Sequence, residues 1–190
     1  MVKNQIRALG IDDAAFDLRR DLQTRLVGVV YRGRNFLEDV LSATIKIDGV
    51  DSTSKIIEMV RQSKFLEQLK VLFLSGITYG GFNTVDVTEL NLSLHIPVIV
   101  ILDKKPDLGK IEKAVSKLNS GGRIMDLIKK AGAVFETITE KGVLRFQTSG
   151  IDVEGAKEFI TLFQLNSKIP EPLRAAQVIA KIFKPCNLSN

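Results

Sequence analysis

The fold is decided by residues 6–47, which read IRALGIDDAAFDLRRDLQTRLVGVVYRGRNFLEDVLSATIKI. Three segments of this stretch are rich in apolar and β-branched residues and end at residues that favour turns. These predicted strands are Ile6–Ile11, Leu26–Tyr31 and Leu41–Ile47. Because the connections between them are short, we expect neighbouring strands to run antiparallel.

Helices and strands alternate in the segment that follows. Residues 52–63 place several apolar side chains at helical spacing, so a helix is predicted there. Two continuous apolar runs, at 69–74 and 96–102, are typical of buried strands, and residues 84–94 can connect them as a crossover helix. This βαβ pattern predicts two parallel strands.

The last third of the chain is mainly helical. A hairpin is predicted around Lys141-Gly142, with strands at 134–138 and 143–146. The predicted helices cover residues 108–118, 124–131 and 153–165, and a last one begins near Pro172.

The order of these elements favours one fold class. Three linked antiparallel strands followed by helix, strand, helix and strand are the layout of the ribonuclease H fold. A doubly wound dinucleotide-binding domain is disfavoured, because it needs a glycine fingerprint after the first strand, where this chain has Gly10-Ile11-Asp12-Asp13. We therefore predict an α/β fold with a ribonuclease H-like mixed sheet and flanking helices.

Composition indicates one compact domain over residues 1–190. The chain is 45% hydrophobic and 26% charged, which is ordinary for a globular domain of this size. No signal-like segment follows Met1, and the apolar run Pro97–Leu102 is far shorter than a membrane-spanning helix, so we expect a cytoplasmic protein without a membrane partner. The single cysteine, Cys186, and the single histidine, His95, have no neighbours that suggest a zinc site or a catalytic triad.

The formal net charge of +5 favours anionic partners such as nucleic acid. Many small basic proteins are simply soluble, however, so the charge alone raises this expectation only modestly. Clustering of the basic residues in space would be stronger support.

Two acidic clusters follow predicted strands. Asp12 and Asp13 come directly after the first strand, so at least one carboxylate is expected where the sheet meets solvent. Such carboxylates hold Mg²⁺ or Mn²⁺ together with water and phosphate oxygens, and the alternative is a turn or a helix cap. Asp48 and Asp51 lie between the third strand and a helix, and Asp51 is a candidate metal ligand or an N-cap, of which the cap is favoured on sequence pattern alone.

A glycine-bearing loop, Ser75–Asn83, follows the fourth strand. It lacks the Gly-Lys-Ser/Thr ending of a nucleotide-binding loop, but its backbone amides are suited to a phosphodiester; the alternative is a flexible turn. The start of the last helix carries an arginine that can reach a phosphate or pair with a carboxylate. The predicted nucleic-acid-binding residues are Gly76, Tyr79, Gly80, Gly81, Asn83 and Arg174.

Four stretches, taken together and in this order, resemble the archaeal endonuclease dU family, which is related to endonuclease V. They are GIDDAAF (10–16), IDGVDST (47–53), GITYGGFN (76–83) and IPEPLR (169–174). The resemblance spans most of the chain and implies an endonuclease V-like fold. It also implies a nuclease dependent on Mg²⁺ or Mn²⁺ that nicks a strand beside a deaminated base, which is hypoxanthine for endonuclease V and uracil for the archaeal branch.

The resemblance also implies roles for individual carboxylates. Asp12 matches the first-strand aspartate that binds the catalytic metal, and Asp51 is the nearest counterpart of the acidic residue before the first crossover helix. These two residues are the expected catalytic pair, with Asp13 and Asp48 as further metal ligands.

Two departures from the endonuclease V pattern bear on activity. Ser75 stands where relatives usually carry another metal-binding aspartate, and serine is a poor magnesium ligand. Metal affinity is therefore expected to be severely reduced unless Asp13, Asp48 or Asp86 supplies the missing charge. The aromatic-Pro-Gly wedge of endonuclease V has no counterpart near 47–49, so recognition of the base must differ.

These considerations give one leading hypothesis and two alternatives. The leading one is a metal-dependent endonuclease of DNA repair that cleaves phosphodiester bonds in DNA containing deaminated bases such as deoxyuridine. The first alternative, prompted by Ser75, is a weak or inactive relative that binds nucleic acid or another protein. The second is a small-molecule enzyme that uses the same acidic cleft.

Overall fold

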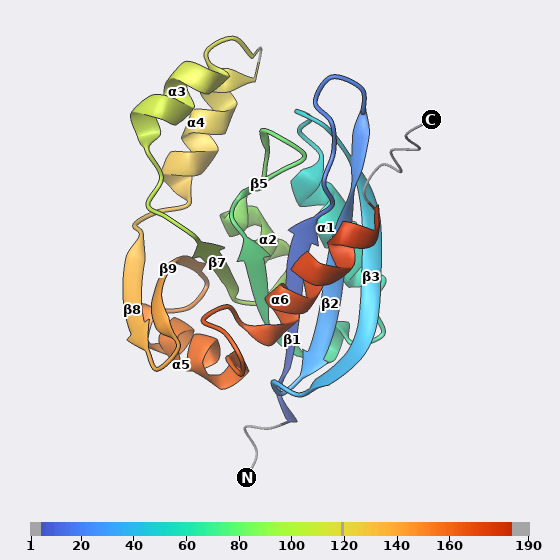
Figure 1. Ribbon diagram of the computed structural model, residues 1–190, viewed down its shortest axis with the longest axis vertical. Coiled ribbons are helices and arrows are strands. Elements are labelled where there is room, and N and C mark those ends of the chain that lie inside the picture. Colours follow the sequence, from blue (N-terminus) through green and yellow to red (C-terminus); the bar gives the residue numbers. More distant parts are fainter. Residues whose placement is uncertain (1–4, 119, 184–190) are drawn as a thin grey trace.

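The computed structural model describes residues 5–118 and 120–183. A seven-stranded mixed sheet, with strand order β3-β2-β1-β4-β7-β9-β8, runs through the molecule (Figure 1). Its strands are β1 (Arg7–Asp13), β2 (Gln23–Arg32), β3 (Phe36–Lys46), β4 (Leu69–Ser75), β7 (Val98–Leu102), β8 (Phe135–Thr139) and β9 (Gly142–Ser149). A separate two-stranded hairpin consists of β5 (Thr78–Tyr79) and β6 (Asn83–Thr84). Cys186 lies outside the described residues.

Helices cover both faces of the sheet. They are α1 (Ser52–Arg61), α2 (Val87–Leu94), α3 (Leu108–Val115), α4 (Gly121–Lys130), α5 (Val153–Phe163) and α6 (Glu171–Ala180), with short 3-10 turns at Leu66–Gln68 and Lys181–Phe183. Within the described ranges, none of these helices has the length and apolar character that crossing a membrane requires.

The strand register confirms the predicted meander and the predicted parallel pair. Gly10 of β1 lies opposite Val29 of the antiparallel β2, and Val29 lies opposite Val40 of β3. On its other side, Gly10 lies beside Phe73 of the parallel β4, and Phe73 lies beside Ile99 of the parallel β7. The carboxyl ends of β1, β4 and β7 therefore share one edge of the sheet.

The predicted late hairpin is also confirmed, and it extends the same sheet. β9 runs antiparallel to β7, with Leu102 opposite Arg145, and β8 forms the outer edge, with Phe135 opposite Phe146. The centroids of the two phenylalanine rings lie 5.9 Å apart, so an aromatic contact joins β8 to β9 within the hairpin.

The crossover helix α2 starts later than predicted. Asn83 and Thr84 pair with the preceding strand of the β5–β6 hairpin, so the chain is extended where a helix was expected. The helix begins only after Asp86, whose carboxylate accepts hydrogen bonds from the backbone N–H groups of Thr88 and Glu89 at 3.1 and 3.0 Å. This N-cap satisfies amide groups that have no partner inside the helix.

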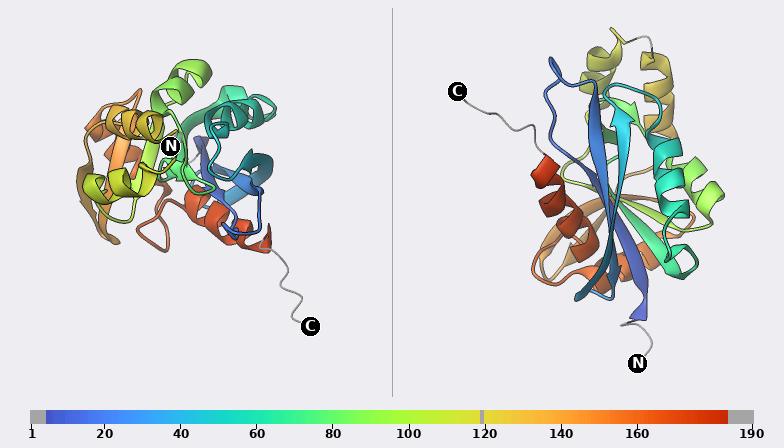
Figure 2. Two further views of the ribbon diagram at one scale, coloured as in Figure 1. Left: turned by 90° about the horizontal axis from the view of Figure 1, so that it is seen from above. Right: turned by 90° about the vertical axis from the view of Figure 1, so that its right-hand side faces the viewer.

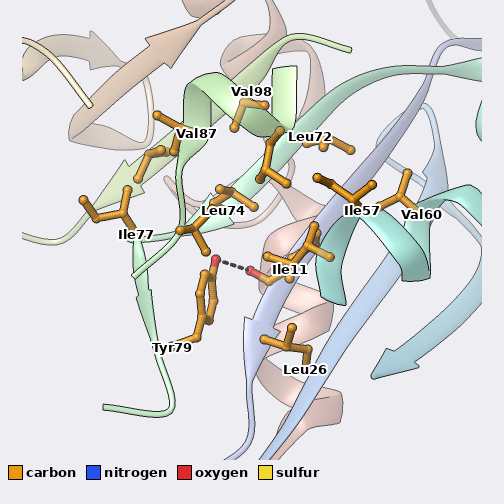
Figure 3. Close-up of a cluster of buried hydrophobic side chains, with 14 of the residues drawn as sticks. Ile11, Leu26, Ile57, Val60, Leu72, Leu74, Ile77, Tyr79, Val87 and Val98 are labelled. Carbon is orange, nitrogen blue, oxygen red and sulfur yellow. Dashed lines mark hydrogen bonds between the residues drawn. The ribbon is translucent and has the colours of Figure 1, made fainter. Parts of the chain in front are cut away.

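Alternation along the strands sends apolar side chains to both faces, and each face has its own core. On one face, Leu9 and Ile11 of β1 pack with residues of α1, α2 and α4; part of this core is drawn in Figure 3. On the other face, Ala8 and Phe73 pack with residues of α5 and α6. Figure 2 shows α6 and α1 on opposite sides of the β1–β3 strands.

Helix α6 lies directly on the backbone of β1 at Gly10. A Cβ atom built on Gly10 would stand 2.2 Å from the carbonyl carbon of Pro172 and 2.3 Å from the backbone nitrogen of Leu173. No side chain can occupy that space, so glycine permits the helix to approach the strand this closely. The contact sets the distance between α6 and the carboxyl-terminal half of β1.

Candidate active site

Three polar residues end neighbouring strands at one edge of the sheet. Asp12 stands near the end of β1, Ser75 ends β4, and Asp103 directly follows β7. Because β1, β4 and β7 are parallel, these residues come from separated parts of the sequence to the same edge. Asp12 interacts with Ser75 through a side-chain hydrogen bond, and the charge of Asp103 acts on Asp12 from the end of β7.

Asp12 occupies the face of β1 that carries α6. Side chains alternate along a strand, so Asp12 points to the same side as Gly10, against which α6 packs. An open cleft of about 450 Å³ lies there. Its lining residues are Asp12, Asp13, Ala14, Ala15, Phe16, Gln177, Ala180 and Lys181.

The environment of Asp12 disfavours its charged form. Burial raises the pKa of Asp12 from 3.8 to about 6, and the negative charges of Asp13 and Asp103 act in the same direction. The hydrogen bond with Ser75 opposes the shift but does not cancel it. A carboxyl group with this perturbation, placed in a cleft, is typical of a functional site.

Asp13 points to the opposite face and holds the β5–β6 hairpin. Its carboxylate accepts a hydrogen bond of 2.7 Å from the backbone N–H of Gly80. Burial raises the pKa of Asp13, and the bond from Gly80 opposes that shift. Asp13 therefore shares the strand end with Asp12 but has a structural partner of its own.

Asp48 and Asp51 are also bound to the hairpin. Asp48 Oδ1 accepts a hydrogen bond from the backbone N–H of Phe82 at 2.8 Å. Asp51 Oδ1 accepts hydrogen bonds from Asn83 Nδ2 at 2.6 Å and from the backbone N–H of Lys46 at 3.2 Å. Asp51 precedes α1, but its side chain makes no capping hydrogen bond, so the predicted N-cap role is wrong.

Tyr79 and Asn83 were predicted to bind nucleic acid, and the structure corrects both assignments. Tyr79 is 1% exposed, and its hydroxyl accepts a hydrogen bond from the backbone N–H of Ser75 at 3.1 Å. The same hydroxyl lies 3.4 Å from the carbonyl oxygen of Ile11 (Figure 3). Asn83 is fully buried and joins Asp51 to the backbone of Lys46 and Ser52. Both side chains position the site from within the protein.

Replacement of Tyr79 by phenylalanine is expected to lower the free energy of unfolding by about 1–3 kcal/mol, because the partly buried backbone N–H of Ser75 loses its acceptor. Urea denaturation measures this change. Tyr31→Phe is the control, since Tyr31 is only partly buried and none of the hydrogen bonds within the described residues uses its hydroxyl. Equal stability of Tyr79→Phe and the wild type would contradict the positioning role.

The remaining predicted contacts differ in their accessibility. Gly76 has a φ of 82°, and no atom lies within 4 Å of the position that a Cβ would take, so its backbone faces open space. Gly80 and Gly81 also have positive φ values, but they pack against Thr24, Ile45 and Asp48. Gly76 and Gly81 are partly exposed and Gly80 is buried, and of the three only Gly76 has open space at the position of a Cβ.

Arg174 has a partner within its own helix. Its guanidinium donates to Glu171 Oε2, with Nη2 at 2.6 Å and Nε at 2.8 Å. Glu171 is only 2% exposed, so Arg174 neutralises a buried carboxylate at the start of α6. The structure thus realises the carboxylate-pairing alternative for Arg174.

The four predicted metal ligands do not meet around one point. Across residues 5–118 and 120–183, no group of three or more His, Cys, Asp or Glu side chains is close enough to hold a metal by itself. Asp86 cannot replace the missing carboxylate, because it caps α2 and pairs with Lys130 at 2.6 Å; this bond lowers the pKa of Asp86 despite partial burial.

The donor set still fits a hard divalent cation that binds together with substrate. Mg²⁺ in proteins often uses only one or two carboxylates, and water and phosphate oxygens complete its coordination. Asp12 and Asp103, at the ends of β1 and β7 on either side of β4, are carboxylates of this kind. With only two carboxylates, such a site would need water and phosphate oxygens to complete the coordination of the cation.

Asp103 is the residue that sequence reasoning missed, together with Gln177 and Lys181 of the cleft wall. The signal for Asp103 was present, since it follows the buried run Pro97–Leu102 just as Asp12 follows the first strand. Gln177 and Lys181 carry no local signal, because only the packing of α6 on β1 brings them to the cleft.

Comparison with known sequences identifies the family of this chain. The sequence pattern of the endonuclease dU family matches residues 4–183. A UPF0215 protein of Methanothermobacter thermautotrophicus is 43% identical over 180 residues, which cover 94% of this chain and 88% of the relative.

Solved structures show the same fold. A protein of unknown function from Archaeoglobus fulgidus has a TM-score of 0.83 and 36% identity, with 92% of this chain and 96% of that chain covered. Endonuclease V of Ciona intestinalis, solved with an inosine-containing DNA, has a TM-score of 0.57 and 14% identity, with 94% and 85% covered. The predicted ribonuclease H-like, endonuclease V-like architecture is confirmed by this similarity, and the chain belongs to the endonuclease dU family.

Proposed function

We propose that this protein is a metal-dependent endonuclease that hydrolyses phosphodiester bonds in DNA containing deaminated bases, such as deoxyuridine. The observation that carries the proposal is Asp12, a partly buried carboxyl group with a raised pKa, in an open cleft where three parallel strands end. The family name and the DNA-bound endonuclease V of the same fold support the substrate class.

Each residue of the edge has a part in the proposal. Asp12 and Asp103 would hold Mg²⁺ or Mn²⁺, which supplies a positive charge that stabilises negative charge on phosphate oxygens and activates water. The open backbone of Gly76 contacts the nucleic-acid strand. Asp51 remains the next candidate ligand, and its bond to Asn83 holds it beside the β5–β6 hairpin.

The proposal is tested with oligonucleotides that carry one deoxyuridine or one inosine, and with an undamaged oligonucleotide as control. Cleavage is expected next to the altered base with Mg²⁺ or Mn²⁺, and none in the presence of EDTA. The variants Asp103→Asn and Asp51→Asn identify the second metal ligand. The variant that lacks a true ligand is expected to require a higher metal concentration for its half-maximal rate of cleavage. Cleavage that persists unchanged in Asp12→Asn would sink the proposed site.

One observation favours a second candidate function. Ser75, and not a carboxylate, ends β4 beside Asp12. A relative with weakened metal binding could keep the fold and bind nucleic acid without cutting it. In that case the wild type binds oligonucleotides but leaves every substrate intact.

Ser75→Asp separates the two functions. The new carboxylate adds an oxygen ligand next to Asp12, so metal-dependent cleavage is expected to increase on the order of 10-fold, as for other residues that adjust metal affinity. Ser75→Asn, of similar size and without charge, is the matched control. Gain of cleavage from an undetectable level supports the second candidate, whereas robust cleavage by the wild type rejects it.

A further inference from the structure

The excess positive charge of the chain is confined to one segment. Residues 104–130 contain eight Lys and Arg against three Asp and Glu, an excess of five. The formal net charge of the whole chain is also +5, so the rest of the chain is balanced. We call residues 104–130, which comprise α3, α4 and the chain leading to them, the basic arm.

The cations of the basic arm are exposed, and most of them are unpaired. All eight are solvent-exposed. Lys110 pairs with Asp107 at 3.4 Å, and Lys130 pairs with Asp86 at 2.6 Å. In the part of the chain that the structure describes, no acidic group lies within 4.0 Å of the other six, which are Lys104, Lys105, Lys113, Lys117, Arg123 and Lys129.

The basic arm begins at the candidate active site. Lys104 and Lys105 directly follow Asp103, the carboxylate whose charge acts on Asp12. From there α3 and α4 rise beyond the end of the sheet (Figure 1). Ile124 and Ile128 of α4 belong to the buried core, so the arm is fixed to the body of the protein.

Three lysines of the basic arm follow one another along α3 and the turn after it. Lys110 and Lys113 lie three residues apart on α3, which places them on one side of this helix, and Lys117 follows in the turn after Val115. A ten-residue helix such as α4 is about 15 Å long. With 3.4 Å of rise per nucleotide along one strand of a duplex, this length matches about four nucleotides.

We propose that the basic arm binds the sugar-phosphate backbone of DNA next to the position of cleavage, without reading its sequence. Exposed lysines and arginines, most of them unpaired, suit this role, because their binding to phosphates releases condensed counterions. The statement that this DNA lies next to a cleaved bond rests on the function proposed above. Binding by the arm itself requires no chemistry at Asp12.

The test compares two triple variants with equal loss of charge. The arm variant carries Lys110→Gln, Lys113→Gln and Lys117→Gln. The control variant carries Lys64→Gln, Lys70→Gln and Lys157→Gln; Lys70 follows the first residue of β4, which pairs with Arg7 at the opposite end of the sheet. Affinity for a duplex containing one deoxyuridine is measured in EDTA over a range of salt concentrations, so that cleavage does not interfere.

The arm variant is expected to bind at least about 10-fold more weakly than the wild type at 0.1 M salt. Its plot of log affinity against log salt should be shallower by about 0.9 for each phosphate that the arm no longer neutralises. The control variant should bind like the wild type. An arm variant with wild-type affinity and salt dependence overturns the inference, even if the wild type cleaves DNA. Weaker binding by the arm variant supports the inference that the basic arm binds DNA. If the wild type also fails to cleave DNA, only the proposed endonuclease function is rejected.

Discussion

Replacement of Asp12 by asparagine is expected to reduce cleavage by a factor on the order of 100 or more and, at the same time, to stabilise the fold. The loss of activity follows from the loss of the carboxylate that would hold the metal, since even residues that only support a ligand contribute factors of about 10 to 100. Single-turnover cleavage of a deoxyuridine-containing oligonucleotide measures it.

The gain in stability follows from the pKa of Asp12, which the fold raises from 3.8 to about 6. Near pH 3.5 and below, the carboxyl group is mostly neutral in both the folded and the unfolded chain, so it has little effect on their balance. Between pH 3.8 and 6 only the unfolded chain loses the proton, and the fold is progressively destabilised. Above pH 6 the carboxyl group is charged in both states, and the loss in free energy of unfolding reaches its full value. For a pKa shift of this size the loss is about 3 kcal/mol.

Asparagine has the shape of aspartate but no charge to bury, so Asp12→Asn should unfold at a higher urea concentration than the wild type at pH 8 and at the same concentration near pH 3.5. Asp126→Asn is the control, since Asp126 is exposed on α4. Added Mg²⁺ should stabilise the wild type but not Asp12→Asn. A variant that is less stable than the wild type at pH 8 would contradict the assigned environment.

Gly10→Ala is expected to destabilise the fold by about 3 kcal/mol or more. The added Cβ would stand 2.2 to 2.4 Å from the backbone atoms of Pro172 and Leu173, which cannot rotate away as a side chain can. Helix α6 must lift from β1, which draws the buried residues Leu173, Ala176 and Ala180 away from the side chains they pack against.

The matched control for this variant is Gly122→Ala. Gly122 lies in the first turn of α4, and no atom lies within 4 Å of the position of its Cβ. Alanine is the better helix former there, by about 0.5–1 kcal/mol, so this variant should equal or exceed the wild type in stability. Urea midpoints of the two variants that move in the same direction would contradict the close contact of α6 and β1.

The architecture was predictable because it rests on local patterns. The strands of the meander and the buried strands β4 and β7 are apolar runs that end at turn residues, and these runs can be recognised without any tertiary contact. The β5–β6 hairpin was not predictable in this way, since strands of two residues show no alternation. Pairing within the hairpin therefore displaced the start of α2.

The site was predicted only in part, for a different physical reason. Asp12 was identified because a carboxylate after a buried strand is a local signal. The motif GITYGGFN, in contrast, contains Gly76, which has open space at its Cβ position, and the buried side chains of Tyr79 and Asn83. The sequence does not show which of these residues are buried, and only the three-dimensional structure distinguishes them. Likewise, the partner of Asp51 is Asn83, 32 residues away, and no local pattern reveals it.

The β5–β6 hairpin is fastened to three carboxylates from two other parts of the chain, through Gly80, Phe82 and Asn83. Local opening of this segment would leave Asp13 and Asp51 without their donors in a partly dehydrated setting, which makes a separate, low-energy fluctuation unfavourable. Most surface connections open independently of the body to which they belong. Here we expect the connection and the strand end that carries Asp12 and Asp13 to open as one cooperative unit, together with the sheet.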